Sequence, residues 1–235
     1  MNVLALDTCL GAVSVAVRWR GAGGEWLMRH AHEVRERGHA ERLMPMIAET
    51  MREAGLAFSD IGRIAVTVGP GTFTGVRGGV AAARGLALAS GVNTVGATSL
   101  AVMAHQADER LGASRGGRLL MVAVDARRDA VYLQIFPGAP GDAAEPPLVL
   151  SPEEAAHRIG PLPVIVVGSG AEPVATAIRA SGGRAEATLV DLQPDARALA
   201  SMAAELVPVR PLRPLYLRPP DVKPQADRSL PRAAP

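Results

Sequence analysis

The sequence predicts an α/β protein made of two lobes that repeat one order of strands and helices. Three observations predict this fold class. Short apolar or alternating runs are separated by turn residues, as is typical of strands. Longer segments carry apolar residues at helical spacing. The order of three strands, a helix, a strand and a helix can be followed in both halves of the 235-residue chain.

The first half begins with a predicted meander of three strands. These strands cover residues 2–7, 12–18 and 25–30, with a glycine-rich turn at 21–24. A helix is expected over 39–55, because Leu43, Ile47 and Met51 recur near helical spacing and Gly55 suits a C-cap. A buried strand at 63–68 and a helix of small residues at 76–90 complete the expected elements of this half.

The second half repeats the order more loosely. Its expected strands are 118–125, 130–136 and 163–168, and its expected helices are 151–159, 171–181 and 195–206. The turn "ARRD" joins the first two strands, and a Pro/Gly-rich loop at 137–147 leads to the short run "LVL". Ser151, followed by proline and two glutamates, is typical of a capped helix start.

These elements divide the chain into three parts. We expect a first lobe at 1–97, a second lobe at 98–207 with a hinge near 97–117, and a basic proline-rich tail at 208–235. The tail holds eight prolines, so we expect it to be partly disordered, although "PLYLR" at 214–218 could dock as a short extended piece. The duplicated order is the plan of actin-like, sugar-kinase and Hsp70-type ATPases.

Composition excludes several classes of protein. Hydrophobic residues make up 48% of the chain, which argues against global disorder. No apolar run approaches the ~20 residues of a membrane span, so we expect no membrane association. The N-terminus lacks the pattern of a signal peptide, and the single cysteine, Cys9, excludes an internal disulfide. We therefore expect a cytoplasmic protein.

The stretch "TVGPGTFTGVRGG" at 67–79 raises the question of a phosphate-binding loop. A Walker loop needs Lys and Ser/Thr after its last glycine, but Val76 and Arg77 follow Gly75 here. The amides of the turn at 69–75 could still hold an anion, but a structural role is favoured. The following helix has a face of little side-chain bulk, which could meet its own sheet, a neighbouring helix or another protein. That face consists of Gly75, Gly79, Ala82, Ala83 and Leu86.

A nucleotide site is the second hypothesis that the residues allow. Asp7 and Thr8 end one strand and Asp125 ends another, where actin-like ATPases handle phosphates and metal. Gly168 and Gly170 in "GSG" lie where such enzymes contact adenosine, but glycines after a strand are also a common turn.

Metal binding and nucleophilic catalysis find little support in the sequence. His39 is followed one turn later by Leu43, so the helix has no His-x-x-x-His pair, and we expect no metal site. Cys9 follows a buried strand and has no histidine nearby in the sequence, so an inert buried thiol is favoured. Seven aromatic residues offer no visible base-stacking platform.

Six segments resemble the bacterial TsaB (YeaZ-type) family in their order along the chain. They are "LALDTCLGAVSVAV", "GHAERLMPMI", "TVGPGTFTGVRGGVAAARGLA", "VDARRDAVYLQIF", "VVGSGA" and "PLYLR". The resemblance covers residues 3 to about 218. It departs from the family at Cys9, where serine is common, and does not explain the tail after Arg218.

The resemblance implies an actin-like two-lobed fold and a non-catalytic role in tRNA modification. TsaB-like chains pair with the catalytic TsaD subunit and the TsaE ATPase. TsaD transfers a threonylcarbamoyl group from its adenylate to the adenosine next to the anticodon, in tRNAs that read codons beginning with A. The resemblance also implies a homodimer through the first-lobe helices when the chain is alone.

From this resemblance and the smooth helix face we predict an interface with the partner. It is formed by Leu43, Ile47, Met51, Gly75, Gly79, Ala82, Ala83 and Leu86. We expect no catalytic residue and no intrinsic cofactor, with ATP or ADP at the interface of the complex left open. The competing hypothesis is a self-sufficient ATP-dependent enzyme that uses Asp7, Asp125 and the Gly168–Gly170 turn.

Overall fold

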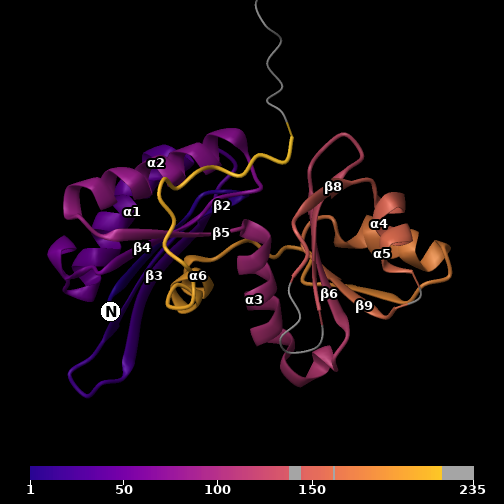
Figure 1. Ribbon diagram of the computed structural model, residues 1–235, viewed down its shortest axis with the longest axis horizontal. Coiled ribbons are helices and arrows are strands. Elements are labelled where there is room, and N and C mark those ends of the chain that lie inside the picture. The colour runs from indigo at the N-terminus through magenta and orange to yellow at the C-terminus, as the bar shows by residue number, and fades with distance from the viewer. Residues whose placement is uncertain (138–143, 161, 219–235) are drawn as a thin grey trace, which may run out of the picture.

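The computed structural model describes residues 1–137, 144–160 and 162–218 of the chain (Figure 1). Two five-stranded sheets, each covered by helices, lie side by side. The predicted tail falls only partly within this description, because residues 219–235, and with them the prediction that they are disordered, lie outside it.

The first lobe is built on a sheet in the order β3-β2-β1-β4-β5. Its strands are β1 (Val3–Asp7), β2 (Ala12–Arg20), β3 (Trp26–Val34), β4 (Arg63–Thr67) and β5 (Asn93–Ala97). β1 pairs antiparallel with β2 and parallel with β4, so that Leu6 lies beside Val15 and Val66. Helices α1 (His39–Ala54) and α2 (Phe73–Ser90) cover one face, and η1 (Phe58–Asp60) precedes β4.

The second lobe repeats this topology in the order β8-β7-β6-β9-β10. Its strands are β6 (Leu119–Asp125), β7 (Val131–Phe136), β8 (Leu148–Leu150), β9 (Val164–Val167) and β10 (Ala185–Thr188). Helices α4 (Pro152–Ile159) and α5 (Ala171–Ala180) pack against each other on this lobe. The Ser151 hydroxyl accepts from the Glu154 amide, and the Glu154 carboxylate accepts from the Ser151 amide, which confirms the capped start.

Two helices lie between the sheets, α3 (Ser99–Leu111) and α6 (Ala196–Met202) (Figure 1). α3 packs on β6 and β7 and is followed by η2 (Gly112–Arg115), whereas α6 packs on β1, β2 and β4 of the first sheet. The expected helix at 195–206 therefore belongs with the first sheet by contact, although it follows the second lobe in sequence. The exact lobe boundaries stay a prediction.

Alternation along β1 explains why helices cover both faces of the first sheet. Leu4 and Leu6 join the core under α1 and α2, whereas Val3 and Ala5 join the core under α6. All five residues of β1 are buried because both faces of the sheet are covered, and the strand is apolar from Val3 to Leu6. The duplicated mixed sheets confirm the predicted α/β, actin-like fold of two lobes.

Two strands and one α-helix were not expected from the sequence. β5, α3 and β10 were not predicted, and the expected hinge near 97–117 is largely occupied by α3. Each lobe therefore has a fifth strand beyond the predicted three strands, helix, strand and helix. Helix α2 begins at Phe73 instead of the expected 76, because the Thr72 hydroxyl accepts a hydrogen bond from the Gly75 amide and caps the helix there.

The segment 208–218 leaves α6 and returns along the first lobe. The Val209 amide donates to the Thr94 carbonyl oxygen at 3.1 Å, and the Leu215 amide donates to the Val68 carbonyl oxygen at 2.7 Å. Leu212 is buried in the core under α1 and α2. The prediction that 214–218 docks on the rest of the chain is confirmed by the bonds of Leu215 and Arg218, although none of its residues forms a strand.

Candidate functional site

The eight residues of the predicted interface lie on the inner side of the first-lobe helices. Six of them are buried within the chain: Leu43, Ile47, Met51, Gly75, Gly79 and Ala83. The other two, Ala82 and Leu86, are partly buried and pack against the same core. The six buried residues are covered by the chain's own sheet and core, so the folded chain does not offer them to a partner. A partner contact at Ala82 and Leu86 stays a prediction.

The glycines of α2 let the helix press against the end of β1. A Cβ at Gly79 would lie 2.5 Å from the Thr8 hydroxyl oxygen, and one at Gly75 would overlap the Thr8 carbonyl oxygen. In this tight contact the Thr8 hydroxyl donates to the Gly75 carbonyl oxygen at 2.7 Å. The smooth helix face therefore meets its own sheet, one of the three alternatives left open by the sequence.

The outer side of the helix pair is a different surface, which we call the outer α1–α2 face. Its exposed small and apolar residues are Ala40, Met44 and Ala48 from α1, and Ala81, Gly85 and Leu88 from α2. The exposed Arg77 and Arg84 lie on the same side of α2. Leu88 is 88% exposed and Met44 is 48% exposed. The two helices contact each other, and a Cβ at Gly78 would lie 3.6 Å from that of Ala40. The face is rich in small and apolar residues and is exposed to solvent in the isolated chain.

This outer face was not predicted, because the prediction chose the apolar stripe of α1 and the small-residue face of α2, and both of these sides pack on the chain's own sheet or core. In a helix on a sheet, the apolar stripe is the side that packs on the sheet. The signal that was available is a second periodic set on each helix, in which alanine, glycine and single large apolar residues lie among the exposed charged residues Glu41, Arg77 and Arg84. Ala81, Gly85 and Leu88 are spaced four and three residues apart and share one side of α2.

Asp7 and Thr8, the first half of the predicted nucleotide site, are turned inward. Asp7 is fully buried and Thr8 almost so. Asp7 Oδ1 accepts hydrogen bonds from the Thr67 hydroxyl and from the Cys9 amide, the latter at 3.3 Å, while Oδ2 is buried without a partner. The nucleotide prediction does not fit these two residues, because the chain itself fills the space around them.

Burial controls the protonation of this cluster. It raises the pKa of Asp7 to about 7, and the hydrogen bonds from Thr67 and Cys9 only partly oppose the rise. Burial also raises the pKa of the Cys9 thiol well above its ordinary value. That thiol donates to the Thr67 hydroxyl oxygen at 3.1 Å. Cys9 is thus a buried, protonated thiol, as the sequence analysis favoured.

We expect Asp7→Asn to change how stability depends on pH. Between the ordinary pKa of 3.8 and about 7, the folded chain holds a proton that the unfolded chain has lost. The free energy of unfolding therefore falls as pH rises through this window. An asparagine side chain cannot ionise, so the variant should be the more stable protein at pH 8. A pKa rise of this size corresponds to roughly 4 kcal/mol, and we expect about half to remain because the amide leaves N–H donors unpaired.

Denaturant unfolding of both proteins at pH 5 and pH 8 measures this effect. The advantage of the Asp7→Asn protein should shrink toward pH 5, where Asp7 is protonated in the folded chain. A variant that is less stable at pH 8 than at pH 5, relative to the parent, would mean that the pKa of Asp7 is not raised in the folded protein.

Asp125, Gly168 and Gly170, the second half of that site, surround the start of α5. The Ser169 hydroxyl accepts from the Asp125 amide at 3.0 Å, and the Gly170 amide donates to the Ala123 carbonyl oxygen at 3.0 Å. A Cβ at Gly168 would lie 2.5 Å from that same oxygen, so this glycine serves close packing of the turn on β6. Asp125 and Gly170 line one cavity of about 630 Å³, and Asp7 and Thr8 are not among its lining residues.

His39 does not lie in a metal-binding geometry. Its Nε2 lies 2.9 Å from the Leu10 carbonyl oxygen, so the ring joins α1 to the turn between β1 and β2. Among the residues that the structure describes, no three His, Cys, Asp or Glu side chains are placed to hold a metal ion. In the same part of the chain, no helix is both long and apolar enough to cross a membrane.

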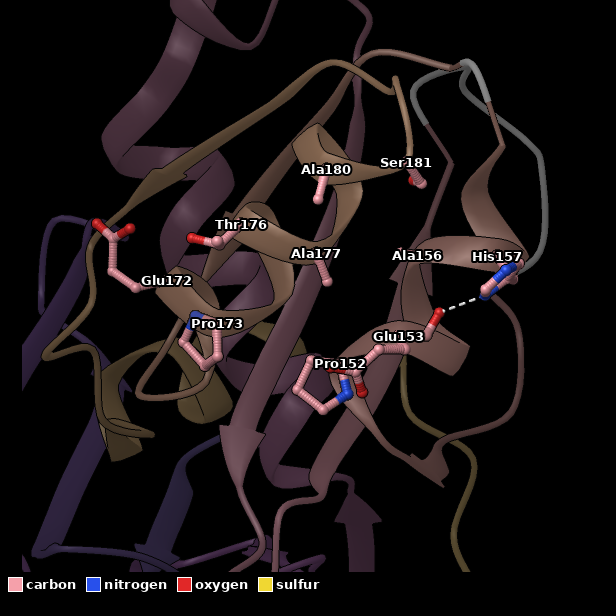
Figure 2. A pocket seen from close by; sticks show the side chains of 10 residues that line it. All are labelled: Pro152, Glu153, Ala156, His157, Glu172, Pro173, Thr176, Ala177, Ala180 and Ser181. Atoms are coloured by element: carbon pink, nitrogen blue, oxygen red, sulfur yellow. Dashed lines mark hydrogen bonds between the residues drawn. The ribbon is translucent and has the colours of Figure 1, made fainter.

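A groove of about 660 Å³ lies along the packed pair α4 and α5 on the second lobe and is lined by residues of both helices (Figure 2). Ala156, Ala177 and Ala180 lie along it, with Glu153 and Glu172 toward one end. Its one histidine, His157, has Nδ1 at 2.7 Å from the Glu153 carbonyl oxygen of its own helix. The groove is mainly apolar, and its lining residues do not form a catalytic arrangement.

Comparisons with known proteins place this geometry in a family. The family model described as TsaD, tRNA N6-adenosine threonylcarbamoyltransferase, matches residues 32–155, just over half of the chain. The chain is 38% identical over 133 residues to the Escherichia coli protein named tRNA threonylcarbamoyladenosine biosynthesis protein TsaB, a match that covers 56% of this chain and 53% of that protein. The match therefore spans only about half the length of this curated relative.

Two other relatives match over nearly their whole length. A Mycobacterium tuberculosis (strain H37Rv) protein without an assigned function is 31% identical over 96% of this chain and 95% of its own. The solved structure of YeaZ from Pseudomonas aeruginosa is 32% identical, covers 92% of this chain and 99% of its own, and superposes with a TM-score of 0.73. The chain belongs to the TsaB (YeaZ-type) family, within the wider group of proteins that the threonylcarbamoyltransferase family model matches.

Proposed function

We propose that this chain is the accessory, non-catalytic subunit of the machinery that makes threonylcarbamoyladenosine in tRNA. The name of its E. coli relative supports the pathway. The inward orientation of Asp7 and Thr8 supports the accessory role, because the residues best placed to bind phosphate are used to pack α2 on β1. The chain then acts in the cytoplasm, where tRNA is modified.

We propose that the catalytic partner is a TsaD-type threonylcarbamoyltransferase, which docks on the outer α1–α2 face. The transferase family model matches the part of this chain that contains both helices, which supports a partner with a similar lobe. Two such lobes can bring equivalent helix pairs together as a four-helix contact, and small residues let helices approach closely. A second copy of this chain is the competing occupant.

The character of the face is the observation that carries this proposal. Its small residues are alanine and glycine, and Met44 and Leu88 are its two large apolar residues, beside Arg77 and Arg84 on α2. Burying a leucine side chain of this exposure contributes about 1.5–3 kcal/mol. Few residues supply most of the energy in protein interfaces, so Leu88 is the expected anchor.

We place a TsaE-type ATPase and tRNA in the same complex, and a nucleotide, ATP or ADP, at an interface of the complex instead of in this chain alone. The rival hypothesis of a self-sufficient ATP-dependent enzyme requires groups that can reach a ligand. Asp125 lines a cavity, but Asp7 is enclosed by the chain.

Reconstitution of tRNA modification tests the proposal. Transferase, ATPase, threonylcarbamoyl-adenylate and unmodified tRNA are combined with and without this chain, and the modified nucleoside is measured after digestion. We expect modification only when the chain is present, and none from the chain with tRNA and adenylate alone. Equal modification without the chain, or modification by the chain alone, would contradict the accessory role.

A further inference from the structure

An aromatic pair lies on the surface where α2 begins. Phe73, the first residue of α2, stacks on Tyr216 of the returning segment, with ring centroids 5.6 Å apart and ring planes inclined by 30°. Phe73 is 47% exposed and Tyr216 is 46% exposed. Rings that stack on each other and remain half exposed leave apolar π surface open to water.

One arginine contacts this pair, and two more are near Tyr216 in the sequence. The Arg77 guanidinium carbon lies 4.9 Å from the centroid of the Phe73 ring. Arg213 is exposed and directly follows the buried Leu212. Arg218 donates through Nη1 to the Ala126 carbonyl oxygen at 2.8 Å. Guanidinium groups both stack on rings and bind phosphate oxygens in a bidentate manner.

The charge of the two segments that build this surface is of one sign. Helix α2 and residues 208–218 contain no Asp or Glu. Their five charged residues are Arg77, Arg84, Arg210, Arg213 and Arg218. The neighbouring turn at 125–129 carries two aspartates and two arginines and so adds no net charge. The two segments therefore carry a net positive charge, and Arg77 is the positive group in contact with the rings.

The platform is held in place on both sides of Tyr216. Leu215 donates its amide to Val68, and Arg218 bonds to the second lobe, as described above. Leu212 anchors the segment in the first-lobe core. A ligand that stacks on Tyr216 would therefore meet a ring whose backbone is already ordered, which lowers the entropy cost of binding.

We propose that Phe73 and Tyr216, with Arg77, Arg213 and Arg218, form a binding surface for an unpaired segment of RNA. One base stacks on the exposed aromatic surface, and the arginines contact the phosphates on either side of it. Exposed aromatics beside arginine are the usual means of holding single-stranded nucleic acid. The choice of RNA over DNA rests on the proposed function. The absence of carboxylates in both segments favours a polyanion over a protein partner.

Fluorescence anisotropy with a labelled single-stranded oligoribonucleotide of about ten nucleotides, and with whole tRNA, tests this proposal. The variants are Tyr216→Ala and Phe73→Ala, with Phe58→Ala as the matched control, because Phe58 is also exposed (41%) but lies in η1. We expect Tyr216→Ala to weaken binding about tenfold, which is the range of one stacked base, and Phe58→Ala to leave it unchanged. A duplex of the same sequence should bind more weakly than the single strand.

The salt dependence separates stacking from charge. Arg213→Ala should lower the slope of log K against log salt by roughly 0.7, the value for one phosphate contact on a single strand. Tyr216→Ala should weaken binding at every salt concentration without changing the slope. Thermal melts of each variant report whether the fold is intact.

Two results would overturn the proposal. One is equal RNA binding by the Tyr216→Ala, Phe73→Ala and Phe58→Ala proteins. This result includes the case in which none of the proteins binds RNA in low-salt buffer. The other is normal RNA binding by these variants together with loss of transferase binding, which would assign the rings to a protein interface. A Leu88→Glu protein that binds RNA but not the transferase would leave this proposal standing and test the docking proposal by itself.

Discussion

A Gly75→Ala protein is expected to lose about 3 kcal/mol of folding free energy, a large part of the stability of an ordinary domain. The added methyl group would overlap the Thr8 carbonyl oxygen and lie 2.6 Å from the Thr72 hydroxyl oxygen. The first of these atoms belongs to the backbone at the end of β1 and cannot rotate away. Relief requires α2 to move off the sheet, which opens the core under it.

Gly85→Ala is the matched control on the same helix. An added Cβ there meets nothing within 4 Å. Replacing an exposed helical glycine by alanine stabilises a helix by about 0.5–1 kcal/mol, so this protein should unfold at a higher denaturant concentration than the parent. Chemical denaturation of the three proteins compares them directly. A Gly75→Ala protein as stable as the parent would show that α2 does not press on Thr8 as described.

Leu88→Glu is expected to weaken binding of the transferase by about a hundredfold or more. The substitution removes an exposed apolar side chain that docking would bury, and it places a carboxylate in the contact. Loss of the apolar burial accounts for about 1.5–3 kcal/mol, and burial of an unpaired charge adds to this cost. Roughly each 1.4 kcal/mol corresponds to a factor of ten in the dissociation constant. Isothermal titration of the purified chain with the transferase measures the change.

Leu162→Glu is the control for this substitution. Leu162 is also an exposed leucine, but it lies in the second lobe ahead of β9. Both variants replace a solvent-covered side chain, so neither should unfold the monomer, and a thermal melt verifies this. Equal affinities of the two variants for the transferase would exclude the outer α1–α2 face as the docking surface.

Comparison with the structure shows which features the sequence could predict. The alternation and turn chemistry predicted both meanders, and the small residues of 75–86 correctly indicated a helix that packs closely on something. They could not indicate which element the helix packs on, because the tertiary fold decides which side of a helix is buried. The prediction assigned Leu43, Ile47 and Met51 to a partner contact. In the structure this apolar stripe packs on the chain's own sheet, as is usual for a helix that covers a sheet.

Other features were hidden for different reasons. β5 carries polar and small residues at Asn93, Thr94 and Gly96, so it lacks the apolar run that marks a strand; its place beside β4 is what makes it one. The stacking of Phe73 on Tyr216 joins residues from distant parts of the chain. No local pattern reports such a contact, and the low aromatic content gave no hint of it.

The claim at the centre of this account is that the outer α1–α2 face, and not the inner stripe, receives the catalytic partner. A photoreactive amino acid placed at Ala81, on the exposed side of α2, tests whether the transferase lies against this face. On irradiation of the chain with the transferase, Ala81 should give crosslinks to the transferase, while the same group at Leu162 should give none. Crosslinks from Leu162 with none from Ala81 would contradict the account.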